Sequence, residues 1–186
     1  MTGKKHRPCP AEMAGMLDNV IRRWFQAPRK ILAPYIKEGM TVLDIGCGPG
    51  FFSIELAKMV GETGRVIASD LQEGMLQRVR RKITGTDFEQ RITLHKTEEH
   101  KIGLSENVDF VLAFYVVHEV PDQEHLLKEI VSLLKPNGQL FIAEPSFHVS
   151  NKAFEETVEI ARAAGLLPVE RPNVFLSKTA LMEKGQ

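Results

Sequence analysis

The chain has 186 residues, the length of one typical domain, and its 43% hydrophobic and 26% charged residues are ordinary globular values. This composition excludes a disordered, collagen-like or low-complexity protein. The 24 Lys and Arg residues balance 24 Asp and Glu residues, so no net charge attracts the chain to nucleic acid or anionic lipid. Two cysteines, Cys9 and Cys47, are too few for a disulfide framework and lack metal-ligand spacing, and no apolar run is long enough to cross a membrane. We therefore expect a cytoplasmic protein without a metal site or a stable membrane insertion.

The first forty residues differ in pattern from the rest. Apolar residues recur at spacings of three and four and predict an amphipathic helix; they are Met13, Met16, Leu17, Val20, Ile21 and Trp24. A shorter helical piece follows between Pro28 and Pro34, and Gly39 ends the segment. The amphipathic helix has three possible roles: a lid over the active site, a cover for the sheet edge, or a membrane-surface helix. We therefore divide the chain into a helical cap, residues 1–39, and a core, residues 40–186.

From residue 41 onward, strand and helix patterns alternate. Strand patterns cover residues 41–45, 65–69, 92–96, 108–115, 139–143, 166–171 and 174–183, and helical patterns cover residues 52–60, 72–83, 122–134 and 151–164. A turn is predicted at Pro136-Asn137-Gly138, just before the fifth strand. Alternation of this kind predicts an α/β fold with a doubly wound, parallel sheet and right-handed crossovers.

The loop after the first strand carries the clearest functional signal. Asp44 is followed by glycines at every second position, Gly46, Gly48 and Gly50, and the loop leads into a helix. Ligands bind beyond the carboxyl ends of strands in such sheets, so this loop is expected to hold a polar cofactor. A tight structural turn is the alternative. Dinucleotide dehydrogenases instead use the spacing G-x-G-x-x-G, which disfavours NAD here.

Asp70 ends the second strand, twenty residues after the last glycine of this loop. A carboxylate there is placed to accept both hydroxyl groups of an adenosine ribose. It would also repel a ribose 2′-phosphate, which argues against NADP. The alternative is that Asp70 caps the next helix, supported by Glu73 three positions later.

These motifs together resemble those of class I S-adenosylmethionine-dependent methyltransferases. The matching segments are Val42-Leu43-Asp44-Ile45-Gly46-Cys47-Gly48-Pro49-Gly50, then Asp70, Val108-Asp109-Phe110-Val111 and Leu134-Lys135-Pro136-Asn137-Gly138-Gln139-Leu140. The resemblance is closest to the small-molecule branch that includes ubiquinone and menaquinone biosynthesis methyltransferases. It implies a mostly parallel seven-stranded sheet with an antiparallel last strand, and S-adenosylmethionine as cofactor.

The resemblance also implies cofactor-binding positions. Asp44 and the glycine loop would surround the methionine portion, and Asp70 would bind the ribose. The acid that usually ends the third strand is missing here, so the adenine contact would pass to Thr97 or Glu98. The full expected set is Asp44, Gly46, Cys47, Gly48, Gly50, Asp70, Leu71, Thr97, Glu98 and Phe114.

The segment after the fourth strand, residues 113–119, should face the transferring methyl group by family position. It lacks the N-P-P-Y or D-P-P-Y pattern of amino-methylating nucleic-acid enzymes and the nucleophilic cysteine of pyrimidine C5 enzymes. His118 is a candidate general base, since an ordinary histidine pKa lies near working pH, or else a packed histidine at a strand-to-helix junction. Tyr115 is a second catalytic candidate with a structural alternative. Glu144 points either into the same cleft or caps a loop.

Three functions from different classes follow. The leading hypothesis is methyl transfer from S-adenosylmethionine to a small-molecule acceptor, with no nucleic-acid partner. The alternatives are an S-adenosylmethionine-binding protein without turnover, acting through a partner, and a nicotinamide-dependent dehydrogenase. Arsenic methylation is disfavoured, because only Cys9 lies outside the cofactor loop.

Overall fold

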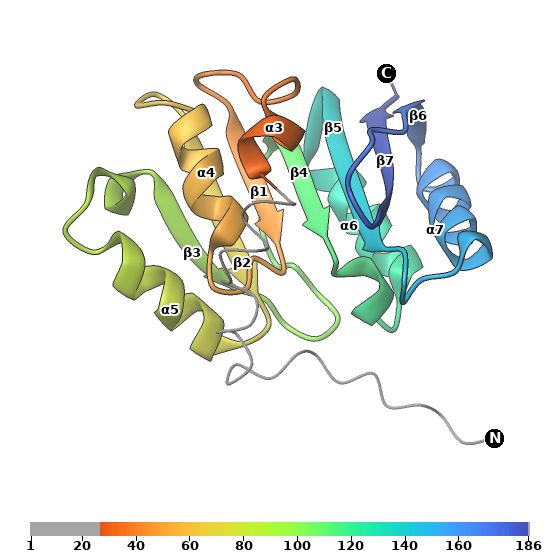
Figure 1. The fold of residues 1–186 in the computed structure, drawn as a ribbon, viewed down its shortest axis with the longest axis horizontal. Coiled ribbons are helices and arrows are strands. Elements are labelled where there is room, and N and C mark those ends of the chain that lie inside the picture. The colour runs from red at the N-terminus through yellow and green to blue at the C-terminus, as the bar shows by residue number, and fades with distance from the viewer. Residues whose placement is uncertain (1–26, 186) are drawn as a thin grey trace.

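The computed structural model describes residues 27–185, which form a seven-stranded sheet with helices on both faces (Figure 1). The strands are β1 (Thr41–Ile45), β2 (Arg65–Asp70), β3 (Ile92–Lys96), β4 (Val108–Phe114), β5 (Leu134–Pro145), β6 (Leu166–Glu170) and β7 (Ser177–Lys184). The α-helices are α3 (Pro28–Leu32), α4 (Phe51–Met59), α5 (Glu73–Ile83), α6 (Gln123–Leu133) and α7 (Asn151–Ala163), and the 3-10 helices are η2 (Asp87–Gln90) and η3 (Val117–Glu119).

The strand order is β3-β2-β1-β4-β5-β7-β6. Strands β1 to β5 are parallel to one another, and β7 runs antiparallel to both β5 and β6. The predicted α/β fold with an antiparallel last strand is therefore confirmed. The chain leaves β1 toward one edge of the sheet and later returns to β4 on its other side. This reversal between β1 and β4 is where an open α/β sheet offers a crevice for ligands.

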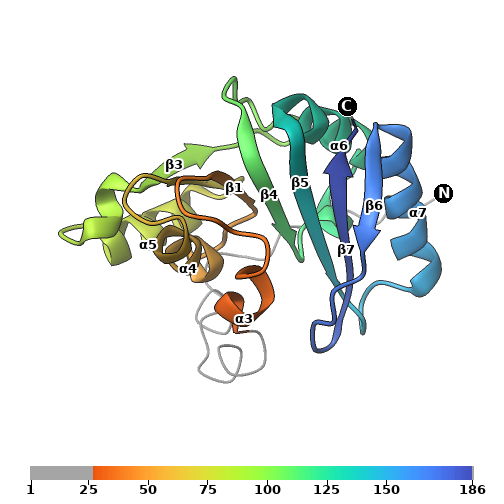
Figure 2. The ribbon, with the colours of Figure 1, turned by 90° about the horizontal axis from the view of Figure 1, so that it is seen from above.

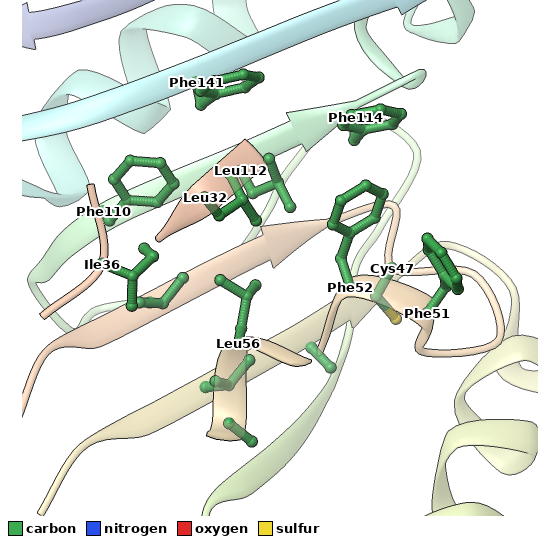
Figure 3. Close-up of a cluster of buried hydrophobic side chains, with 14 of the residues drawn as sticks. Leu32, Ile36, Cys47, Phe51, Phe52, Leu56, Phe110, Leu112, Phe114 and Phe141 are labelled. Atoms are coloured by element: carbon green, nitrogen blue, oxygen red, sulfur yellow. The ribbon is translucent and has the colours of Figure 1, made fainter. Parts of the chain in front are cut away.

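Two hydrophobic cores lie on the two faces of the sheet. Helices α3, α4 and α5 cover one face, and α6 and α7 cover the other (Figure 2). Alternation along β5 supplies both cores: Phe141 faces the first and Leu140 faces the second. Phe52 and Phe114 face each other in the first core (Figure 3), with ring centroids 4.3 Å apart. Leu32 of α3 is fully buried in the same core, so this short helix packs as part of the sheet's cover.

Two expected boundaries were wrong. Strand β5 begins at Leu134, because the predicted turn at Pro136-Asn137-Gly138 is a bulge within the strand, where Asn137 has a φ of 59° and the pairing with β4 shifts register. The last strand begins at Ser177 and not at residue 174. There the chain turns first: the Ser177 N–H donates to the Val174 carbonyl (3.0 Å), and Leu176 has a φ of 54°.

The remaining elements follow their predicted patterns closely, apart from η2 and η3, which were not expected. A 3-10 helix of three or four residues is too short to leave a periodic apolar pattern. The predicted amphipathic helix around Met13 to Trp24 lies outside the described residues. Within residues 27–185, no helix combines the length and the hydrophobicity that crossing a bilayer requires.

Candidate functional site

A cavity of about 710 Å³ opens at the carboxyl end of the sheet, beside the point where the strand order reverses. Its walls come from the segments that follow β1, β2, β3 and β4, together with residues after β5. The residues expected to bind a cofactor or to act in catalysis lie in this wall, with one exception. Gly50 does not line the cavity and instead faces α5.

The three glycines of the β1–α4 loop have different roles. All have positive φ, at 65°, 53° and 84° for Gly46, Gly48 and Gly50. A Cβ at Gly46 would lie 2.6 Å from Val116 Cγ2, and one at Gly50 would lie 3.0 Å from Val79 Cγ2. A Cβ at Gly48 would meet no protein atom within 4 Å, although Gly48 lines the cavity. Packing therefore requires glycine at 46 and 50, whereas Gly48 leaves space open to a ligand.

Backbone hydrogen bonds tie this loop to the end of β2. The Cys47 N–H donates to the Ser69 carbonyl (2.9 Å), and the Gly48 N–H donates to Asp70 Oδ2 (2.9 Å). Helix α4 starts directly after Gly50, and no side chain caps its first turn. The N–H groups at this end of the helix are therefore suited to an anionic group such as a carboxylate.

Asp44 and Cys47 form the buried floor of the loop. The Asp44 side chain is 2% exposed and accepts a hydrogen bond from Ser53 Oγ (2.6 Å) in the first turn of α4. Burial raises the pKa of the Cys47 thiol, and the negative charges of Asp44 and Asp70 raise it further. Cys47 is therefore a protonated, unreactive thiol that lines the cavity.

Both carboxylate oxygens of Asp70 accept hydrogen bonds from backbone N–H groups. Oδ2 accepts from Gly48, and Oδ1 accepts from the Gln72 N–H (2.7 Å). Burial raises the pKa of Asp70, while these two N–H donors and the Lys96 charge oppose the rise. A carboxylate has about four acceptor positions, so acceptor capacity remains for ligand hydroxyls. Asp70 is not the helix cap, because Gln72 is the N-cap residue of α5.

The wall next to Asp70 is formed by the end of β3 and by β4. Thr97 is buried, and its N–H donates to the Asp70 carbonyl (3.1 Å). Glu98 and Leu71 are more exposed and line the same side of the cavity. Phe114 ends β4 and is held between Phe52 and the ring of Tyr115. This wall offers a flat, partly apolar surface next to a carboxylate.

Another part of the cavity wall is formed by a histidine that is paired with a buried carboxylate. His118 lies in η3, and Glu144 lies near the end of β5 with 1% exposure. One oxygen of Glu144 is hydrogen-bonded to His118 Nδ1, and the other accepts from the His118 N–H (3.3 Å). The His148 ring stands edge-on to that of His118, with centroids 5.1 Å apart. Both imidazoles line the cavity, whereas Glu144 lies behind them.

Tyr115 lines the cavity with its phenol oxygen engaged elsewhere. That oxygen lies 2.6 Å from Ser177 Oγ at the start of β7, and the Tyr115 N–H donates to the Ala143 carbonyl (2.8 Å). Its φ of 62° is unusual for a residue other than glycine. Tyr115 therefore joins the end of β4 to β5 and β7.

Sequence reasoning did not single out His148 or Glu119, which also line the cavity. His148 lies in the loop after β5, thirty positions beyond His118, so no spacing rule links the two. Glu119 directly follows His118 and ends the segment 113–119 that was expected to face the methyl group, but it was given no role of its own. Burial raises the pKa of Glu119, and the charge of His118 opposes the rise.

Comparison with known proteins gives a consistent result. A family described as a methyltransferase domain matches residues 36–173. The demethylmenaquinone methyltransferase of Lactobacillus johnsonii is 37% identical over 112 residues, which are 60% of this chain and 46% of that protein. The chain thus spans about half the length of the curated relatives it matches.

Solved structures share the fold over nearly the whole chain. A crystal structure of a SAM-dependent methyltransferase from Aquifex aeolicus has a TM-score of 0.84 and 30% identity, covering 95% of this chain and 99% of that one. The N-methyltransferase NodS of Bradyrhizobium japonicum, in complex with S-adenosyl-L-homocysteine, has a TM-score of 0.72 at 19% identity and covers 91% and 90% of the two chains. The second likeness shows the fold alone.

Proposed function

We propose that this chain, which belongs to the class I S-adenosylmethionine-dependent methyltransferases, transfers the cofactor's methyl group to a small-molecule acceptor. The observation that carries the proposal is one cavity whose wall combines two unlike groups of residues. One group is the glycine loop with the uncapped start of α4 and Asp70, and the other is His118 bonded to Glu144. A methyl donor and an acceptor bound at these two groups would meet inside the cavity.

The residues present fit S-adenosylmethionine. We assign its ribose hydroxyls to Asp70, its methionine portion to Asp44 and the glycine loop, and its adenine to the wall of Leu71, Thr97, Glu98 and Phe114. The space beside Gly48 supports this assignment, because a side chain there would meet only a ligand. When bound, the cofactor supplies a sulfonium methyl group: an acceptor electron pair bonds to the methyl carbon as the carbon–sulfur bond breaks and its electrons return to sulfur.

For the acceptor we propose a small molecule with a hydroxylated ring. The curated relatives are named for demethylmenaquinone, which makes a quinol the first class to test. His118 is the catalytic residue, and its role is to remove a proton from the acceptor. We do not include Tyr115, because its phenol oxygen is bonded to Ser177. The segment after β4 lacks the residue patterns of nucleobase methyltransferases, so we expect no nucleic-acid acceptor.

The unpaired thiol of Cys47 fits a reducing compartment, and we therefore expect the protein to work in the cytoplasm. An S-adenosylmethionine-binding protein without turnover is the second candidate. Its distinguishing result would be cofactor binding without any methylated product.

Two measurements test the proposal. Calorimetry should show binding of S-adenosylmethionine and S-adenosylhomocysteine and weak binding of NAD and NADP. Incubation with methyl-labelled cofactor should label reduced demethylmenaquinone, kept as the quinol under anaerobic conditions, and leave tRNA unlabelled. Tighter binding of NAD would contradict the cofactor assignment. Label transferred to tRNA but not to the quinol would contradict the acceptor class.

A further inference from the structure

Glu144 is a buried acid at the end of β5, next to the cavity but not in its wall. Both of its carboxylate oxygens are used by one residue, His118, through the backbone N–H and ring Nδ1. A buried carboxylate is costly unless it is paired and hydrogen-bonded, and His118 provides both. Glu144 therefore acts on His118 through both of its oxygens.

The pair determines which ring nitrogen faces the acceptor. Because Glu144 bonds to Nδ1, that nitrogen carries a proton in the neutral ring, and Nε2 is left with its lone pair. His118 lines the cavity while Glu144 lies behind it, so Nε2 is the nitrogen available to a bound acceptor. A fixed tautomer and orientation are the properties that a general base requires.

Three charged or titratable groups face His118. They are Glu144 from β5, Glu119 from η3 and His148 from the loop after β5. Burial alone would lower the pKa of His118, but the hydrogen bond and charge of Glu144, with the charge of Glu119, raise it above the ordinary value of 6.5. The surroundings thus favour the imidazolium form.

We propose that Glu144 is a positioning residue that holds His118 as a general base, and that the acceptor therefore belongs to the class whose hydroxyl group must be ionised before methylation, such as phenols and hydroquinones. This inference rests on the proposed function. His118 Nε2 takes the hydroxyl proton, and the freed electron pair makes the acceptor oxygen, or a ring carbon conjugated to it, nucleophilic toward the methyl group. When the carbon is methylated, its C–H proton then leaves to restore the aromatic ring, and the oxygen takes a proton back. Glu144 stabilises the imidazolium that results. Thioethers and tertiary amines have no proton to lose and would not need the pair.

If Glu144 only capped the loop at His118, the variant Glu144→Gln would have a different effect. Glutamine keeps an acceptor for the His118 N–H and nearly the same volume, so a capping role would survive the change. Glutamine lacks the negative charge that stabilises an imidazolium. Its amide N–H can also donate to Nδ1, which would put the proton of the neutral ring on Nε2. Only the positioning role therefore predicts a change in His118 itself.

The first test measures the His118 ring by ¹⁵N NMR on the full chain saturated with S-adenosylhomocysteine, with the signal assigned by its loss in His118→Gln. In the wild type, the neutral ring should be protonated on Nδ1. In Glu144→Gln, His118 should titrate at a lower pH. The matched control is Glu183→Gln, a carboxylate on β7 that accepts from Gln139 (3.1 Å) outside the cavity, and it should leave the titration unchanged. A wild-type ring protonated on Nε2 would overturn the proposal without any variant.

The second test measures kcat/KM against pH with reduced demethylmenaquinone as acceptor. A base is active when neutral, so kcat/KM should rise with pH and level off above the His118 pKa, placing the rising limb above pH 6.5. Glu144→Gln should lower the plateau by about 100-fold and move the limb to lower pH, and Glu144→Asp should restore part of the rate. If Glu144→Gln methylates the acceptor and the rising limb of its pH profile stays at the wild-type position, the proposed role of Glu144 is wrong. If no acceptor is methylated, the proposed function fails while the NMR result still stands.

Discussion

The two parts of the cavity wall are built in different ways. The part that we assign to the cofactor is centred on backbone: Gly46, Gly48 and the uncapped start of α4 come from one continuous segment, supported by Asp70. The part that we assign to the acceptor depends on side chains from two distant segments: His118 follows β4, whereas Glu144, which supports it, and His148 lie at and after the end of β5. Backbone geometry can serve one cofactor across many proteins, whereas side chains can be exchanged one at a time. A substitution should therefore change the chemistry more readily at His118 or His148 than at the loop, where a side chain would have to fit a positive φ.

The largest expected effect is in the part assigned to the acceptor. Replacing His118 by glutamine should lower kcat by roughly 100- to 10,000-fold, because general-base catalysis contributes that much. Cofactor affinity, measured by calorimetry, should stay within about 2-fold, since His118 is not in the part of the cavity wall that we assign to the cofactor.

His95→Gln is the control for this substitution. His95 is also a half-buried histidine and does not line the cavity, although its ring is bonded to the carbonyl of Ile102 (2.6 Å), which does. Its loss should leave kcat nearly unchanged. A similar loss of cofactor affinity and rate in His118→Gln would mean that the two parts of the cavity wall are not separate.

In the part assigned to the cofactor, Gly48→Val should weaken S-adenosylmethionine binding by roughly 10- to 100-fold, because branched carbons enter the space left for the ligand. The positive φ also costs about 1–3 kcal/mol of folding free energy. Calorimetry and thermal unfolding separate the two effects.

Gly85→Val provides the matched control. Gly85 has a φ of 74° and, like Gly48, no atom within 4 Å of an added Cβ, but it lies away from the cavity. It should show the same loss of stability with unchanged affinity. Equal affinities in the two variants would place the cofactor elsewhere.

Asp70→Asn should lower cofactor affinity by about 10-fold, since a charge-assisted hydrogen bond is replaced by a neutral one. Stability should also fall, because the amide nitrogen must face a backbone N–H at Gly48 or Gln72. Asp109→Asn makes the comparable change at the other end of the sheet, where the carboxylate accepts from the Thr41 N–H (2.8 Å) and Lys135. Asp109→Asn should lower the stability and leave the cofactor affinity unchanged. Undiminished affinity in Asp70→Asn would remove Asp70 from the site.

The smallest expected effect is at Tyr115. Replacement by phenylalanine removes the hydrogen bond to Ser177, so the free energy of unfolding should fall by about 1 kcal/mol. The rate should change by less than about 2-fold, because we assign the phenol a structural role. Ser177→Ala should give a similar loss, and the double variant should lose little more than either single one. A rate loss as large as that of His118→Gln would make Tyr115 a catalytic residue.

The strand, loop and helix around the three glycines were predictable because their signals are local. Glycines at alternate positions after an apolar run indicate a strand, a loop and a helix, and Asp70 follows at the end of the next strand. The sequence could not show that the three glycines have different roles, because the distances from Gly46 to Val116 and from Gly50 to Val79 depend on packing between distant elements.

The part assigned to the acceptor was only partly predictable. His118 was a candidate from its place after β4, but Glu144 had two possible roles, and the choice depends on η3, which turns His118 toward the end of β5. A three-residue 3-10 helix leaves no periodic pattern in a sequence. The role of residues 13–24 stays a prediction, since that segment lies outside the described residues.

The missing Cβ of Gly46 also limits how this protein can diversify. Val116 occupies the space that a side chain at 46 would need, so the cofactor loop and the segment after β4 are in direct contact. In a paralogue with a different acceptor, a larger residue at position 116 would clash with the loop that we assign to the methyl donor. Phe147, by contrast, lines the cavity with 79% of its surface exposed. New acceptor specificities should therefore arise by exchange at Phe147 and His148, because Gly46 has no side chain to give up if residue 116 became larger.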